Sequence, residues 1–170
     1  SRCLLEQLPE NTDVAFVLNP KFDATELLAA ICDDLGVNVP KDGSLKTYVD
    51  CLNERLLENH AVDKHTVLII DEAQNLSDDV LETIRLLTNL ETNTQKLLQI
   101  ILIGQPELTE NLAKPTLRQL NQRITARYHL LPLSSNEVKS YIGHRLQVAN
   151  GDIAIFSKSA IQAVFNITGG

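Results

Sequence analysis

The segment from Thr66 to Glu72 constrains the fold of this 170-residue chain more than any other part of the sequence. Four consecutive aliphatic residues, three of them β-branched, follow Thr66, and the adjacent carboxylates Asp71 and Glu72 end the run. A short, uninterrupted apolar run is typical of a strand that is buried on both faces of a parallel sheet. Asp71 and Glu72 are therefore expected at the carboxyl end of such a strand.

Segments that favour strands alternate with segments that favour helices along the chain. Strands are expected at residues 14–18, 66–70, 98–103 and 124–131. Helices are expected at residues 1–8, 25–35, 44–59, 77–90, 134–149 and 157–167, and two short helices begin at Pro106 and Pro115. The alternation predicts an α/β fold with a parallel, doubly wound sheet and helices on both faces.

The last two expected helices follow one another without a strand between them. Ser134 and Glu137 have the spacing of a capping box and begin the first of them, and Ser157 begins the second. This change of pattern predicts two domains, an αβα core at residues 1–132 and the start of a helical unit at residues 133–170.

The carboxylates after the apolar run have the Walker B form of a P-loop ATPase, but a second interpretation is open. In a Walker B site, Asp71 holds Mg²⁺ through water, because Mg²⁺ prefers oxygen ligands and keeps several waters. Glu72 then orients or deprotonates the attacking water. On these residues alone, an acidic turn that follows a buried strand explains the pattern equally well.

The glycines of a phosphate-binding loop are absent from this sequence. That loop needs two glycines five positions apart, the second followed by lysine, so that backbone N–H groups point at the phosphates. None of the seven glycines has a partner at that spacing, and none precedes a lysine. The chain also has no methionine. The chain thus carries one half of a nucleotide site without the other, and the missing methionine predicts that both of its ends were cut.

Composition restricts the other classes of function. A formal net charge of −7 is unsuited to nonspecific nucleic-acid binding, although residues 111–136 contain no Asp or Glu and carry Lys114, Arg118, Arg123 and Arg127. The three cysteines are widely spaced, which favours buried thiols over bridges or ligands, and the four histidines lack metal-binding spacing. No run of residues reaches the apolar length of a membrane helix.

Three sequence blocks together resemble a known family. They are TVLIIDEAQNL at residues 66–76, ILIGQPEL at 101–108 and LRQLNQRITARYHL at 117–130. They are similar to AAA+ ATPases of the general secretion pathway protein A (ExeA) type, whose relatives include a pilus-biogenesis ATPase of the mannose-sensitive haemagglutinin system and transposition accessory ATPases of the TniB type. The resemblance covers nearly the whole chain. It implies a P-loop NTPase (AAA+) sheet whose N-terminal strand and P-loop precede Ser1, and a helical lid whose sensor 2 arginine follows Gly170.

The resemblance also assigns roles to four residues. It implies that Asp71 coordinates Mg²⁺ through water, that Glu72 is the catalytic glutamate and that Gln105 is the sensor 1 residue near the γ-phosphate. Arg123 matches the arginine finger, whose planar charge would stabilise the transferred phosphoryl group in a neighbouring subunit. Each role has a competitor: Gln105 caps the helix that starts at Pro106, and Arg123 belongs to a solvated basic surface together with Arg118 and Arg127.

By this resemblance, the parent protein uses ATP and Mg²⁺ and self-associates into a ring or another oligomer. It would power assembly in bacterial type II secretion or type IV pilus biogenesis, from the cytoplasmic side of an inner-membrane protein whose membrane regions lie outside this chain. The 170 residues alone are expected to bind ATP·Mg²⁺ weakly and to be inactive. Two alternatives stay open, a DNA transposition accessory ATPase and a catalytically dead interaction module.

Overall fold

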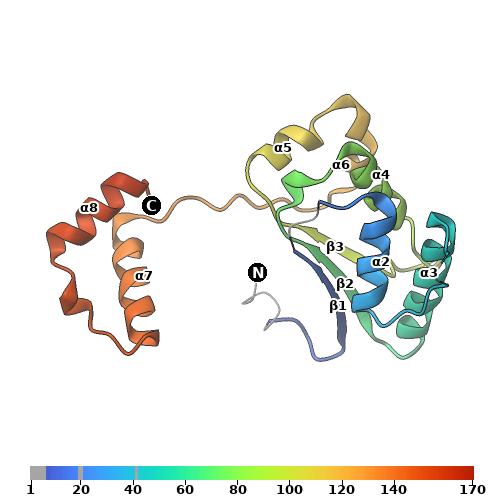
Figure 1. The fold of residues 1–170 in the computed structure, drawn as a ribbon, viewed down its shortest axis with the longest axis horizontal. Coiled ribbons are helices and arrows are strands. Elements are labelled where there is room, and N and C mark those ends of the chain that lie inside the picture. Colours follow the sequence, from blue (N-terminus) through green and yellow to red (C-terminus); the bar gives the residue numbers. More distant parts are fainter. Residues whose placement is uncertain (1–6, 19–20, 41) are drawn as a thin grey trace. The chain divides into compact units, whose positions relative to one another are not determined.

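The computed structural model describes residues 7–18, 21–40 and 42–170, which belong to two compact units. One unit is Ser1–Thr125 and the other is Ala126–Gly170. Figure 1 shows the sheet with its helices in the first unit and further helices in the second. Most of the helix expected at residues 1–8 lies outside the described residues.

A parallel sheet forms the centre of the first unit. Its strands are β1 (Thr12–Val17), β2 (His65–Ile70) and β3 (Gln99–Leu102), in the order β1-β2-β3. Val17 lies opposite Ile70, and Ile70 lies opposite Leu102. The carboxyl ends of the three strands are therefore side by side. The first three expected strands and their parallel arrangement are thus confirmed, with boundaries shifted by one or two residues.

The helices of this unit begin where the capping residues predict. They are α2 (Ala24–Asp34), α3 (Leu45–Ala61), α4 (Asp78–Leu87), α5 (Glu107–Leu112) and α6 (Arg118–Arg123), with short 3₁₀ turns at Ala73–Asn75 and Pro115–Leu117. Ser44 Oγ accepts a hydrogen bond from the Thr47 N–H, and Ser77 Oγ accepts one from the Val80 N–H, each over 3.3 Å. Both hydroxyls satisfy an N–H that has no partner inside its helix.

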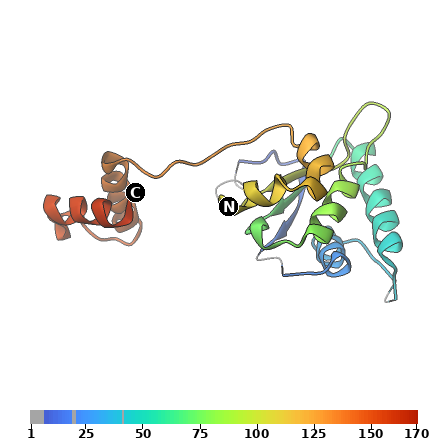
Figure 2. The same cartoon turned by 90° about the horizontal axis from the view of Figure 1, so that it is seen from above.

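The core lies between the sheet and the helices α2, α3 and α4, which cover one face of it (Figures 1 and 2). Alternate strand residues point into this core, since side chains of a strand alternate between the two faces. The central strand β2 is the most deeply placed, with Leu68, Ile69 and Ile70 fully buried. Asp71 therefore follows directly after a strand that is held by the packing of its last three residues.

The prediction of a strand at residues 124–131 is wrong. The segment that follows α6 forms no ladder with any described strand, and Tyr128 and Leu130 are 89% and 81% exposed. Its apolar pattern favours a strand, but a strand forms only where a neighbouring backbone supplies hydrogen-bond partners. Local propensity therefore mispredicted this segment.

The second unit consists of α7 (Ser135–Val148), a 3₁₀ turn at Ile153–Ile155 and α8 (Lys158–Thr168). The capping box is present as expected: Glu137 Oε2 accepts from the Ser134 N–H over 2.7 Å, and Ser134 Oγ accepts from the Glu137 N–H over 3.4 Å. Val138 and Ile161 are the buried apolar side chains of these two helices. Among the residues that the structure describes, no helix is long and apolar enough to cross a membrane.

Candidate functional site

Asp71 and Glu72 lie at the carboxyl end of the central strand, as the sequence predicts. The Asp71 N–H donates to the Val17 carbonyl over 2.9 Å and so extends the ladder between β1 and β2. Glu72 then takes a left-handed conformation with φ of 53°, which is uncommon for a residue other than glycine. Its N–H donates to Asp71 Oδ1 over 3.0 Å. The chain thus turns sharply between the two carboxylates, and both side chains are half-buried.

Gln74 connects this turn to the segment that follows β3. Its Nε2 donates to Glu72 Oε2 over 2.6 Å, and its Oε1 accepts from the Gln105 N–H over 3.1 Å. The Ala73 N–H donates to the Ile103 carbonyl over 2.9 Å, which joins the same two segments through the backbone. The structure therefore brings the segments of Glu72 and Gln105 together, through the backbone N–H of Gln105. Sequence reasoning overlooked Gln74, although a polar residue two positions after Glu72 was the available signal.

Arg123 lies elsewhere. Its Nη1 donates to Thr88 Oγ1 over 2.7 Å and bonds to Asn89 Oδ1, at the C-terminal end of α4. α4 has ten residues, so its axis is about 15 Å long. It begins at Asp78, close in sequence to Glu72, and ends beside Arg123. In this chain, Arg123 is therefore not beside Asp71 and Glu72.

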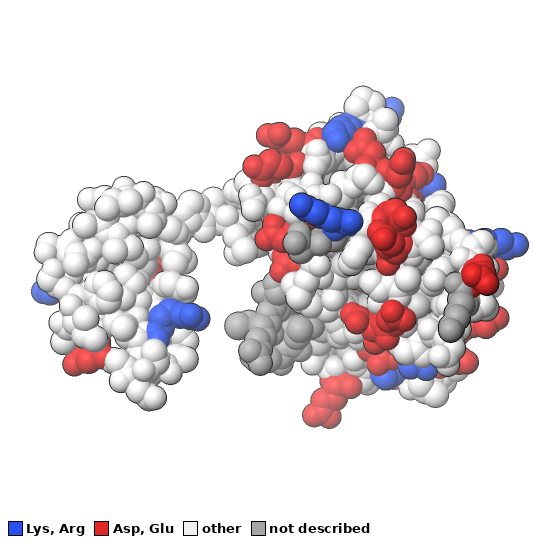
Figure 3. All heavy atoms as spheres, viewed as in Figure 1, with Lys and Arg blue, Asp and Glu red and all other residues white. Residues whose placement is uncertain are grey.

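Two cations of the acid-free stretch at residues 111–136 contact opposite ends of α4. Lys114 Nζ pairs with Asp78 Oδ1 over 2.9 Å, at the first residue of the helix, and Arg123 binds its last turn. The hydrogen bond from Lys114 lowers the pKa of the exposed Asp78 carboxyl. On the face seen in Figure 3, acidic side chains are spread over the first unit and basic ones are scattered among them, without a continuous basic surface.

The donor set at Asp71 fits a magnesium ion better than a transition metal. Within the described residues, no three His, Cys, Asp or Glu side chains form a cluster that could hold a metal. Mg²⁺ does not need such a cluster, because it is commonly bound by one or two carboxylates together with waters and substrate phosphates. The half-buried Asp71 carboxylate at a strand end supplies a hard oxygen ligand of this kind.

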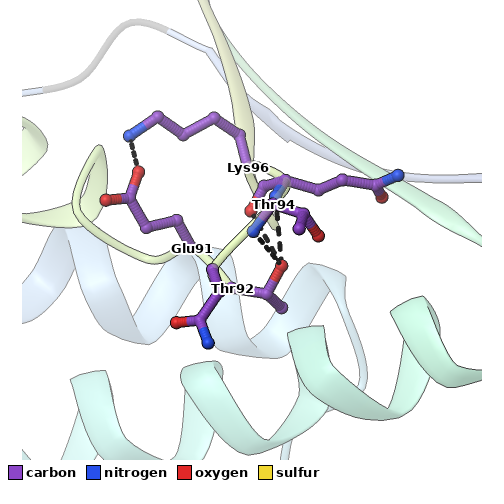
Figure 4. Close-up of a pocket in the computed structure, with 6 residues that line it drawn as sticks. Glu91, Thr92, Thr94 and Lys96 are labelled. Atoms are coloured by element: carbon purple, nitrogen blue, oxygen red, sulfur yellow. Dashed lines mark hydrogen bonds and ion pairs between the residues drawn. The ribbon is translucent and has the colours of Figure 1, made fainter.

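A hollow of about 230 Å³ in the turn before β3 is not part of this site (Figure 4). It lies between Glu91 and Lys96, whose side chains form an ion pair, and Thr92 Oγ1 accepts from the Gln95 N–H over 3.1 Å. The ion pair with Lys96 lowers the pKa of Glu91. The turn precedes β3, whereas Asp71 follows its parallel neighbour β2, so the two lie at opposite ends of the sheet. The hollow is a feature of a hydrogen-bonded turn.

The sequence profile of the AAA domain family matches residues 1–112. The chain belongs to the AAA domain family. Over all 170 residues it is 53% identical to General secretion pathway protein A of Aeromonas hydrophila. The match covers 31% of that protein, so this AAA domain spans about a third of the relative's length. The resemblance found in the three sequence blocks is confirmed.

Solved structures of other AAA+ proteins have the same fold. Cdc6p of Pyrobaculum aerophilum matches with a TM-score of 0.58 and 20% identity, over 78% of this chain and 34% of its own. The ADP form of the Aeropyrum pernix ORC2 protein matches with a TM-score of 0.61 and 17% identity, over 86% of this chain and 39% of its own. At these identities the likeness concerns the fold alone, and it confirms the α/β P-loop NTPase class.

Proposed function

We propose that this AAA domain binds ATP and Mg²⁺ and hydrolyses ATP to ADP and phosphate within a longer protein. The observation that carries the proposal is the arrangement of Asp71 and Glu72 after the buried central strand, with Glu72 bonded through Gln74 to the segment of Gln105. Catalysis by positioning needs carboxylates on rigid supports. Membership of the AAA family and the similarity to General secretion pathway protein A support the same chemistry.

The four candidate residues would divide the work. Asp71 would hold Mg²⁺ through water, and bound Mg²⁺ neutralises charge on the phosphates. Glu72 would orient the attacking water and accept its proton, while Gln105 would contact the γ-phosphate or that water. The phosphate-binding loop would be supplied by sequence outside these 170 residues, so the isolated chain would bind ATP weakly.

Arg123 would act on a neighbouring subunit. Its contacts with Thr88 and Asn89 are at the C-terminal end of α4, whereas the loop that carries Glu72 precedes the N-terminal end of this helix. Held at that end of α4, the exposed side chain of Arg123 would meet the site of an adjacent copy that packs there. The proposal therefore includes self-association into a ring or another oligomer.

ATP hydrolysis by this domain would power assembly in bacterial secretion or pilus biogenesis. This part rests on the name of the Aeromonas hydrophila relative and on 53% identity over the chain. The domain would act on the cytoplasmic side, with membrane contacts made by regions outside it. The DNA transposition alternative gains no support from the basic stretch, because Lys114 is paired with Asp78 and the formal net charge of the chain is −7.

The magnesium dependence of ATP hydrolysis tests the proposal in the complete protein. Asp71→Asn removes the negative charge that would attract the ion and nearly preserves the side-chain shape. We expect turnover to require more Mg²⁺ and to fall by at least about tenfold at the concentration that saturates the wild type. Asp79→Asn, at an exposed acid of α4, is the matched control. Equal magnesium dependence in wild type and Asp71→Asn would contradict the assignment.

A further inference from the structure

We propose that Gln74 is a positioning residue that fixes the carboxylate of Glu72 relative to the segment of Gln105. This inference rests on the proposed ATPase function. Both ends of the Gln74 amide are bonded, one to Glu72 Oε2 over 2.6 Å and the other to the Gln105 N–H over 3.1 Å. One half-buried side chain thus spans the two loops that carry the candidate catalytic and sensor residues.

The chemistry of the two partners suits an amide at this position. An ionised carboxylate only accepts hydrogen bonds, and a backbone N–H only donates. The connecting side chain must therefore donate at one end and accept at the other, as the NH₂ and carbonyl groups of glutamine do. A glutamate at this position would set two carboxylates against each other, and a lysine could not accept from Gln105.

Gly104 provides an independent observation that the Gln74 side chain is closely confined. A Cβ atom on Gly104 would lie 2.8 Å from Gln74 Oε1 and 3.3 Å from the Gln74 backbone nitrogen. Gly104 has no positive φ, so close approach and not backbone conformation accounts for a glycine here. The loop after β3 is thus shaped to admit the amide of Gln74.

The backbone of Gln74 is also fixed. Asn111 Nδ2, on α5, donates to the Gln74 carbonyl over 3.2 Å. Removing the Gln74 amide should therefore free the Glu72 carboxylate to rotate without displacing Asp71, which the β2 ladder holds. A change confined to Glu72 affects the turnover of bound ATP and leaves its binding intact.

The test is ATP hydrolysis by the complete protein carrying Gln74→Met, which keeps the length of the side chain and removes both bonds. We expect kcat to fall by about 10- to 100-fold, with KM for ATP and the melting temperature unchanged. Gln95→Met, the same change in the exposed turn before β3, should leave kcat unaltered. A wild-type kcat for Gln74→Met would overturn the positioning role.

Gly104→Ala gives a second test, because it keeps the glutamine and crowds its carbonyl end most closely, with the added Cβ 2.8 Å from Gln74 Oε1. It should lower kcat as Gln74→Met does, and the double variant should be no worse than the poorer single variant. A double variant whose loss of kcat equals the product of the two single losses would overturn the inference. A Gly104→Ala variant with the wild-type kcat would overturn it too, and this second outcome can be measured even if Gln74→Met folds poorly.

Glu72→Gln separates this inference from the proposed function. If Gln74 acts through Glu72, adding Gln74→Met to Glu72→Gln should cause no further loss of turnover. An inactive Glu72→Gln beside a fully active Gln74→Met would refute the role of Gln74 and leave the ATPase standing. ATP turnover that Glu72→Gln leaves at the wild-type level would refute the role of Glu72, and a wild-type protein without ATP turnover would refute the ATPase itself.

Discussion

The guanidinium of Arg123 donates a hydrogen bond to Thr88 Oγ1 over 2.7 Å, at the C-terminal end of α4. The same threonine hydroxyl donates to the Arg85 carbonyl over 2.6 Å, so Arg123 binds a side chain that is already fixed by the last turn of the helix. Glu72 precedes the other end of that helix by a few residues. This separation within one chain makes Arg123 a candidate to serve the site of a neighbouring copy.

If Arg123 acts between subunits, two inactive variants should complement each other. Arg123→Ala keeps its own Glu72, and Glu72→Gln keeps its own Arg123. We expect each complete protein alone to have little ATP turnover, and an equal mixture to regain about a quarter of the wild-type rate, the share of interfaces that have both groups intact. Arg118→Ala, at an exposed arginine of the same helix, should remain active alone. A mixture as inactive as its components would contradict the prediction.

The basic stretch should not make this protein a DNA-binding protein. Lys114 is paired with Asp78, and the formal net charge of the chain is −7. We expect the complete protein to show weak binding to duplex DNA, and Lys114→Ala to leave that binding unchanged, measured by fluorescence anisotropy at 50 and 200 mM salt. A loss of affinity of about 10³-fold or more over that range would indicate many phosphate contacts and favour the transposition alternative.

The packing of α4 should depend on its buried face. Leu81 is fully buried, whereas Leu86 on the same helix is 42% exposed. Leu81→Ala should destabilise the domain by about 2–5 kcal/mol, because it leaves a cavity in the core. Leu86→Ala should cost less than about 1 kcal/mol. Urea unfolding compares the two, and equal losses would show that α4 does not pack as described.

Asp13 should make the sheet sensitive to acid. Burial opposes ionisation of Asp13, but hydrogen bonds from Lys64 and Asn59 and the charges of Lys64 and Arg55 outweigh it and lower the pKa of Asp13. Lys64 Nζ lies 2.5 Å from its Oδ1, and Asn59 Nδ2 lies 2.9 Å from its Oδ2. A lowered pKa stabilises the fold at pH values above the unfolded pKa of about 4. This stabilisation is lost as the pH falls through the folded pKa.

Asp13→Asn tests this dependence. The variant should expose the β1 amides to faster hydrogen–deuterium exchange than the wild type at pH 7, by an amount equivalent to about 1 kcal/mol. The difference should shrink as the pH falls from about 4 through the lowered pKa of folded Asp13, below which the wild-type carboxyl is also protonated. A difference that stays constant from pH 7 to pH 3 would contradict the ionic role of Asp13.

Much of this fold follows from local sequence signals. The run from Thr66 to Ile70 is apolar at every position after the first, and it forms the buried central strand. Ser44, Ser77 and Ser134 begin helices because each hydroxyl satisfies a backbone N–H of the first turn. Such signals involve residues three or four apart, which is why sequence alone reveals them.

The contacts that are distant in sequence could not be predicted in this way. The bond between Gln74 and Gln105 joins residues 31 positions apart, and the bond between Arg123 and Thr88 joins residues 35 apart. The strand expected at residues 124–131 failed for a similar reason, since strand formation depends on a neighbour that propensity does not reveal. The positions of Asp71 and Glu72 were predictable because a strand end locates them.

The most direct test of the central claim is ATP hydrolysis by the complete protein with Glu72→Gln, measured together with nucleotide binding. We predict that turnover falls by at least about 10²-fold, the contribution of a positioned general base, while the affinity for ATP stays at its wild-type value. Glu54→Gln, at an exposed glutamate of α3, should change neither quantity. Wild-type turnover in Glu72→Gln would contradict the assignment of Glu72 and the site built on it.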